Sequence, residues 1–183
     1  GVNPFADAAA RTTAMPSPVE GQMSSLSDTD SVERYDGSAW AAIAGGKILQ
    51  VVIGTLDTTD RSTSSATFVD VTGVTVTITP QKIDSEILLV ATFNGRIDTS
   101  GSTWLSTQIA DASNNAMSGA GDNLMGALSH GGNFATLQTL IATVSPATLS
   151  AVTYKLRFKT TSGTGTILNA TMGGRMYAIE VAA

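Results

Sequence analysis

The sequence contains no cysteine, a single histidine and few aromatic side chains, which make up 5% of its 183 residues. Without cysteine, disulfides, thiol catalysis and cysteine-based zinc sites are excluded. His130 has no acidic partner in a triad-like pattern, so it is interpreted as a polar loop or interface residue and not as a catalytic base. No apolar run approaches the roughly 20 residues that cross a bilayer, and no secretory signal is recognisable. We therefore expect no membrane insertion.

Charged residues are also scarce, at 14%, and the formal net charge is −5. Nucleic-acid binding needs clustered Lys and Arg, so the composition argues against it. The acidity is uneven: residues 1–45 hold six acids and two bases, a net charge of −4. Two interpretations follow for this segment, namely contact with a basic partner surface or ordinary solvated turns.

Thr and Ser are abundant, 45 together, and there are 18 Gly, a mixture that favours strands and turns over surface helices. Residues 152–159 alternate clearly, with Val152, Tyr154, Leu156 and Phe158 on one face. The apolar run 87–93 predicts a central strand that is buried on both faces. Eight or nine strands predict an all-β antiparallel sandwich, a jelly roll, over residues 47–183. The expected strands are 48–56, 67–79, 87–93, 103–110, 124–128, 137–144, 152–159, 165–171 and 176–181.

The N-terminal 45 residues show a different pattern. Residues 19–40 predict a small β-meander with turns at 28–30 and 36–38. For residues 1–16 two interpretations are open: one or two helical turns around residues 6–14, or an extended arm that orders only on docking. Such a unit is too small to bury a core of its own, so we expect it to lean on a partner surface. Ala44-Gly45-Gly46 is the expected linker. The residues expected to anchor the unit are Tyr35, Asp36, Gly37 and Trp40.

Three stretches of text carry a resemblance. Ala9-Ala10-Arg11, the PSPVEG of residues 16–21 and the YDGSAW of residues 35–40 resemble a leader of bacteriophage virion structural proteins. Residues 71–90 (VTGVTVTITPQKIDSEILLV) and 177–181 (YAIEV) are similar to the C1q/TNF-like jelly roll of the same proteins. The resemblance implies a homotrimer located on the virion, docked to capsid or tail proteins through residues 1–45. Because the sequence shows no catalytic constellation, we expect this structural protein to be non-enzymatic. It does not distinguish head decoration proteins from minor tail or fibre proteins.

Two other function classes compete with this interpretation. A carbohydrate-binding module would recognise a host surface glycan, with Trp104 as the possible ligand contact, although an aromatic residue in a strand is more often part of a core. A polysaccharide hydrolase would need paired carboxylates, and the candidates Asp98, Asp111 and Asp122 lie in loops where solvated acids are common.

The remaining motifs are explained by structure alone. Asp28 and Asp30, like Asp57 and Asp60, carry oxygens that calcium favours, but they lack the spacing of a calcium loop and are typical of turns. The glycine-rich segments 117–126 and 162–166 lack the lysine of a phosphate-binding loop. The basic stripe of Lys155, Arg157 and Lys159 is interpreted as a solvated strand face. We expect no cofactor and no metal.

Overall fold

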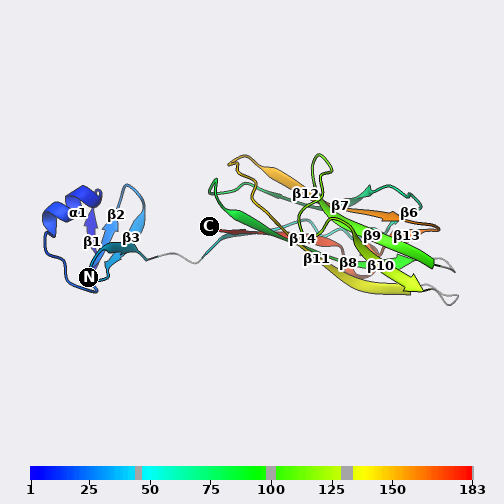
Figure 1. Ribbon diagram of the computed structural model, residues 1–183, viewed down its shortest axis with the longest axis horizontal. Helices are drawn as coiled ribbons and strands as arrows, with labels where there is room; N and C mark the ends of the chain where they lie inside the picture. The colour runs from blue at the N-terminus through cyan, green and yellow to red at the C-terminus, as the bar shows by residue number, and fades with distance from the viewer. Residues whose placement is uncertain (44–46, 98–101, 129–133, 183) are drawn as a thin grey trace. The chain divides into compact units, whose positions relative to one another are not determined.

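A computed structural model describes residues 1–43, 47–97, 102–128 and 134–182. The chain divides into two compact units, Gly1–Gly46 and Lys47–Ala183, and the strands belong to one or the other (Figure 1). The predicted linker Ala44-Gly45-Gly46 lies outside the described residues. In the described part of the chain, the longest helix has seven residues, so none could cross a membrane.

The N-terminal unit is a four-stranded sheet with one short helix, in the order β1-β2-β3-β4. Strand β1 is parallel to β2, and the other pairs are antiparallel. Helix α1 begins where the Asp7 side chain accepts a hydrogen bond from the Ala10 N–H at 2.7 Å. The arm expected over residues 1–16 is therefore folded back onto the sheet. The elements are β1 (Asn3–Phe5), α1 (Ala8–Ala14), β2 (Met23–Leu26), β3 (Ser31–Tyr35) and β4 (Trp40–Ala42).

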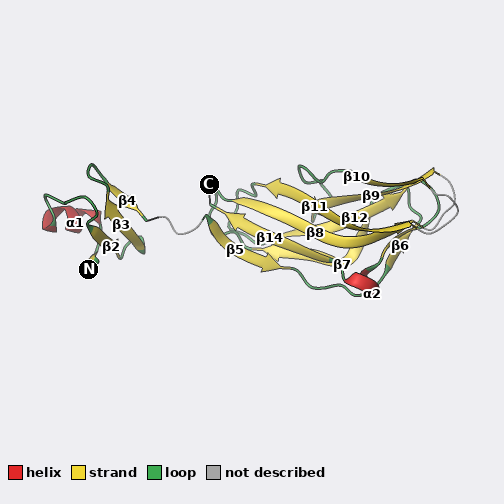
Figure 2. Ribbon diagram, turned by 90° about the horizontal axis from the view of Figure 1, so that it is seen from below, coloured by secondary structure: helices red, strands yellow, loops and turns green. Residues whose placement is uncertain are grey.

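The C-terminal unit is a sandwich of two antiparallel sheets, which confirms the predicted all-β jelly roll (Figure 2). One sheet has the order β10-β9-β12-β7. In the other sheet, β8 pairs with β11 and with β14, and β5 pairs with β14. The end of β8 also pairs with β13, which in turn pairs with β6. The elements are β5 (Ile48–Ile53), β6 (Arg61–Thr63), β7 (Val69–Ile78), β8 (Glu86–Ile97), β9 (Ser102–Asp111), β10 (Asn123–Leu128), β11 (Phe134–Val144), β12 (Val152–Thr160), β13 (Gly165–Ile167), α2 (Asn169–Met172) and β14 (Arg175–Val181).

The core lies between the two sheets and follows the alternation of the strands. Tyr154, Leu156 and Phe158 of β12 are buried, as their alternation predicts. The same rule corrects the prediction for residues 87–93. Alternate residues of β8, from Ile87 to Phe93, are fully buried, whereas the residues between them are only partly covered. The strand is therefore buried on one face of the single chain and not on both.

Tertiary hydrogen bonds change one further prediction. The strand expected over 165–171 ends at Ile167 and is followed by α2. The Ala170 N–H donates to Asp60 at 2.8 Å, and the Asn169 side chain donates to the buried Asp57 at 2.7 Å. The segment 57–65, between β5 and β7, thus holds α2 in place and also supplies β6, which pairs with β13. The alternation of apolar and polar residues along a strand does not predict such contacts between distant segments.

Candidate functional site

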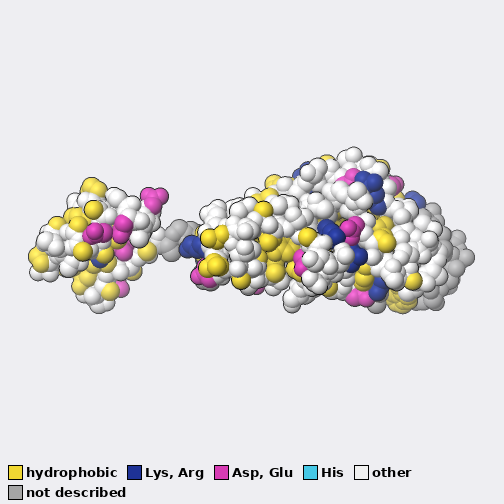
Figure 3. Space-filling view, turned by 90° about the horizontal axis from the view of Figure 1, so that it is seen from above, with side chains coloured by type: hydrophobic (Ala, Val, Ile, Leu, Met, Phe, Trp, Pro, Cys, Tyr) yellow, Lys and Arg dark blue, Asp and Glu magenta, His cyan; other side chains and the backbone are white. Residues whose placement is uncertain are grey.

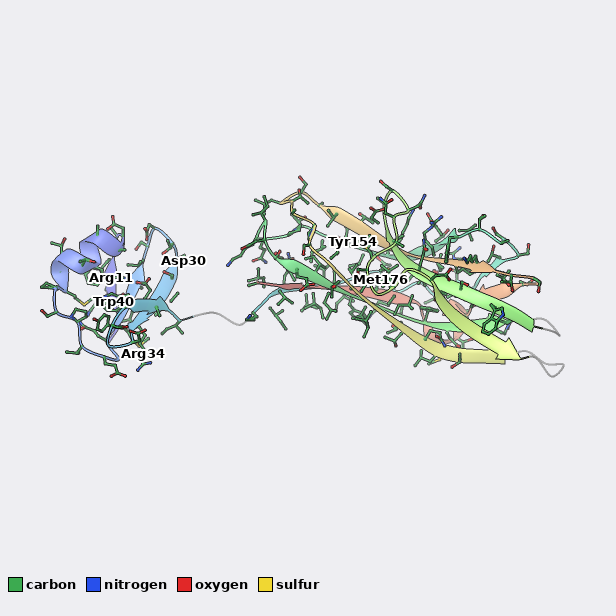
Figure 4. All side chains as sticks on the ribbon, viewed as in Figure 1. Arg11, Asp30, Arg34, Trp40, Tyr154 and Met176 are labelled. Atoms are coloured by element: carbon green, nitrogen blue, oxygen red, sulfur yellow. The ribbon has the colours of Figure 1, made fainter. Side chains whose placement is uncertain are left out.

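Arg11, Glu33 and Trp40 form a side-chain cluster within the N-terminal unit. Arg11 of α1 is 7% exposed, forms an ion pair with Glu33 of β3, and lies over the ring of Trp40. Figure 4 shows Arg11 and Trp40 together between the helix and the sheet. The distance from the guanidinium carbon to the ring centroid is 4.7 Å, which is within cation–π range. Trp40 therefore has a binding partner inside its own unit.

The turn between β3 and β4 orients Tyr35 and Trp40. The Asp36 carboxylate accepts hydrogen bonds from the Ser38 N–H, the Ser38 hydroxyl and the Ala39 N–H, at 2.8 to 2.9 Å. The backbone N–H groups of Ala39 and Ser38 lower the pKa of Asp36 to about 2. Gly37 has a φ of 102°, a conformation that L side chains avoid. The Tyr35 and Trp40 rings then lie with their centroids 5.5 Å apart.

The structure thus brings the four predicted anchoring residues into one hairpin, and their contact with a partner stays a prediction. The sequence interpretation missed Glu33 and the pairing of Arg11, although Arg11 belongs to the leader text. The sequence did contain a sign of this pair. Arg11 lies in a short Ala-rich segment and Glu33 in an expected strand, and in a unit with few apolar residues such a pair of opposite charges can form an internal ion pair.

The exterior of the N-terminal unit is acidic. Glu33 neutralises Arg11, whereas Asp28, Asp30 and Asp36 are exposed. Arg34 is also exposed and lies 3.8 Å from Glu20. Acidic side chains are visible on this unit in Figure 3. The negative charge of this surface would therefore attract a basic partner.

A second candidate surface covers the outside of the β5-β14-β8-β11 sheet. The register aligns Ile53 with Tyr177, Tyr177 with Val90, and Val90 with Ile141, so four side chains form one row across four strands. Ile53 and Ile141, on the two outer strands, are 58% and 56% exposed. A row of this kind keeps its side chains on one face because neighbours in register point the same way.

The adjacent row repeats this pattern. Val51 is aligned with Ile179, Ile179 with Leu88, and Leu88 with Thr143. We call the two rows the outer apolar face, which consists of Val51, Ile53, Leu88, Val90, Ile141, Tyr177 and Ile179. Contiguous exposed apolar surface of this kind marks interaction sites, whereas singly scattered apolar residues do not.

The opposite sheet presents paired charges. Lys155 and Arg157 each bond the Asp70 carboxylate, at 2.8 and 2.9 Å, and Lys159 bonds Asp122 at 2.9 Å. Figure 3 shows basic and acidic side chains next to each other on the sandwich. Burial opposes ionisation of Asp70, but hydrogen bonds from Lys155 and Arg157 lower its pKa. The predicted basic stripe is thus neutralised on the surface, which does not favour phosphate binding.

Of the other candidate residues, the structure describes Trp104, Asp111 and Asp122. Trp104 of β9 is 41% exposed, so it is a surface residue and not part of the core. Asp111 accepts hydrogen bonds from Asn115, and Asp122 is paired with Lys159. His130 and Asp98 lie outside the described residues. Among the residues that the structure describes, no group of three or more His, Cys, Asp or Glu side chains could hold a metal ion.

No protein-family model matches the sequence, and no curated protein sequence matches it. A structure of infectious bursal disease virus, Gt strain, is similar with 12% identity over 83% of this chain and 44% of that chain, at a TM-score of 0.39. The Gx strain of that virus gives 10% identity over 83% and 38%, at 0.42. The enzymatically active domain of bacteriophage CBA120 tailspike protein 4 gives 17% identity over 71% and 19%, at 0.27. The chain thus spans less than half the length of each, and identities of this size do not transfer a function.

Proposed function

We propose that this protein is a non-enzymatic structural component of a bacteriophage particle, a homotrimeric surface appendage that its N-terminal unit attaches to capsid or tail proteins. The leader text at Ala9-Ala10-Arg11, 16–21 and 35–40 supports the phage assignment. The observation that carries self-association is the outer apolar face, whose register runs unbroken across four strands.

Burial of the outer apolar face between copies would explain why the sequence of β8 is apolar on both faces, although the single chain buries only one of them. Each large aliphatic side chain that leaves water contributes about 1.5–3 kcal/mol, and Ile53 and Ile141 have more than half of their surface still to bury. Three copies with this face toward a common axis would cover it in all of them, with closed symmetry. The outer face of the other sheet, with its Asp70 and Asp122 pairs, would stay in water.

The N-terminal unit is proposed as the attachment segment. Its acidic exterior would meet a basic patch on the particle, and the hairpin of Tyr35, Asp36, Gly37 and Trp40 holds its shape. Because exposed charges are screened by salt, attachment should weaken as ionic strength rises. The internal Arg11–Trp40 contact lets this unit fold before it docks.

Purified particles test the assignment. Mass spectrometry should detect the protein in the particles, and a variant that lacks residues 1–43 should still form trimers yet be absent from them. Gold labelling of intact particles would then place it on the head or on the tail. Particles that lack the wild-type protein would contradict the proposal, and so would particles that retain the truncated variant.

A carbohydrate-binding module is the second candidate, because Trp104 is 41% exposed on a strand. Exposed aromatic rings present a flat apolar surface to ligands. A glycan array would show binding that Trp104→Ala abolishes. A negative array, or binding that survives this substitution, would remove Trp104 from the account.

A further inference from the structure

A cavity of about 510 Å³ opens at one end of the sandwich, where β9 and β11 end and β12 begins. Its volume is within the range of about 300–1,000 Å³ that is typical of small-molecule sites. Polar and apolar side chains share the wall. The residues that carry the argument are Asp111, Ser113, Met117, Pro146 and Tyr154.

Tyr154 supplies a hydroxyl to the wall of this cavity. The residue is 3% exposed and belongs to the core between the sheets (Figure 4). Within the described part of the chain, its hydroxyl forms no hydrogen bond. The hydroxyl oxygen is not fully enclosed by protein, and Tyr154 lines the cavity. This donor is therefore available to a ligand that binds there.

Asp111 supplies an acceptor beside that donor. The register places Asp111 of β9 directly opposite Tyr154 of β12, so the two side chains leave the sheet on the same face. Burial, followed by the negative charge of Asp111, raises the pKa of Tyr154, which therefore stays a neutral donor. The Asn115 side chain holds the pKa of Asp111 below its usual value, so Asp111 stays a carboxylate.

The wall chemistry selects the ligand class. Among the residues that the structure describes, no Lys or Arg lines the cavity, and the Asp111 carboxylate would repel an anion. Ser113 shares this wall with the apolar residues Met117 and Pro146. A ring that carries hydroxyls on its edge and C–H groups on its face matches such a wall.

We propose that this cavity binds a neutral polyhydroxylated ring, such as a monosaccharide unit, with Asp111 accepting from its hydroxyls and the Tyr154 hydroxyl donating to it. This site is separate from Trp104. Trp104 and Asp111 lie seven residues apart on β9, which corresponds to roughly 23 Å along a strand. The inference goes beyond the structural role and does not depend on it.

Saturation-transfer NMR on the full chain tests the site, with glucose, galactose, mannose and N-acetylglucosamine as probes and glucuronic acid as the anionic comparison. We expect a signal from at least one neutral sugar and none from glucuronic acid. Tyr154→Phe should weaken that binding about tenfold, since one lost hydrogen bond corresponds to about 1.4 kcal/mol. Asp111→Ala should weaken it further, whereas Thr58→Val, which alters an exposed threonine outside the cavity, should leave it unchanged.

An oligosaccharide that ends in the bound sugar distinguishes the two sources of this chemistry. Tighter binding of the oligosaccharide would assign the site to a glycan chain, and equal binding would assign it to the free sugar. Absence of binding by every neutral sugar and its oligosaccharide would overturn the proposal. Equal binding by Tyr154→Phe, with an unchanged melting temperature, or binding of glucuronic acid, would also overturn it.

Discussion

Arg11 of α1 and Trp40 of β4 are far apart in the sequence of the N-terminal unit but in direct contact, with the guanidinium carbon 4.7 Å from the ring centroid. The same guanidinium pairs with Glu33. A unit of this size has little apolar material, and one buried cation that touches both a carboxylate and an aromatic ring ties its helix to its sheet. The sequence expectation of a segment that must lean on a partner overlooked this internal contact.

Arg11→Ala should therefore unfold the N-terminal unit and leave the sandwich intact. Removal of one member of a buried ion pair costs on the order of 3–5 kcal/mol, which is a large part of the stability of a small domain. Urea unfolding followed by Trp40 fluorescence, in a Trp104→Phe background, measures it. The unfolding midpoint of Arg11→Lys should lie between those of the wild type and Arg11→Ala, because an ammonium keeps the charge without the planar fork. An unchanged midpoint for Arg11→Ala would contradict this.

Asp36 should titrate far below an ordinary aspartate. Its pKa is lowered to about 2 by the Ala39 and Ser38 hydrogen bonds. Because the folded pKa is depressed, the stability that Asp36 contributes is present above its ordinary pKa and is lost as the pH falls toward 2. NMR titration of its side-chain carbon should show this midpoint, with Asp36 of the urea-unfolded protein as the comparison. Equal Asp36 midpoints in the folded and the unfolded protein would refute the turn geometry.

Gly54 should not tolerate a side chain. A Cβ on Gly54 would overlap the carbonyl oxygen of Thr75 and lie 3.0 Å from that of Met176. Because both neighbours are backbone, relief would require the strands to move, and we expect Gly54→Ala to cost about 1–3 kcal/mol. Gly121→Ala is the matched control, since its Cβ would meet only Ala116, at 3.8 Å. Equal melting temperatures of the two variants would contradict the packing.

Glu180 should make the sandwich acid-sensitive. Burial would raise its pKa, but hydrogen bonds from Gln50, Ser85 and the Gln81 and Lys82 N–H groups outweigh burial and lower it. The stability that this carboxylate contributes is complete above the ordinary glutamate pKa of about 4.3, and it is lost as the pH falls through the lowered folded value.

Glu180→Gln should therefore reduce the stability of the sandwich by about 1–3 kcal/mol at neutral pH. It should also flatten the decline in stability between about pH 5 and pH 2. Thermal unfolding across this range measures both effects. Glu86→Gln, on the exposed start of β8, is the control. A wild-type and a Glu180→Gln profile that fall in parallel would show that the carboxylate has no such role.

Strand positions were predictable because buried and exposed residues alternate, as in β7 and β12. The limits of prediction are equally specific. Residues 87–93 are apolar on both faces, but the sequence does not tell whether the second face is covered by the same chain or by another copy. Helix α2 depends on Asp57 and Asp60 from a distant insert. The cavity pairs Asp111 with Tyr154 through strand register, which alternation alone does not give.

The outer apolar face supports the central claim, that the protein works as a trimer. A substitution there should separate subunits without unfolding them, because Ile53 and Ile141 point away from the core. Ile53→Asp with Ile141→Asp is the informative variant. Leu149→Asp is its matched control, because Leu149 is 57% exposed and lies in the β11–β12 connection, outside the face.

Sedimentation equilibrium of the full chain and these variants is the most direct measurement. The account predicts a wild-type mass three times the 18.7 kDa of one chain. It predicts the same mass for Leu149→Asp, and a folded monomer for the double Asp variant. A wild-type protein that sediments as a monomer, or a double variant that remains trimeric, would contradict it.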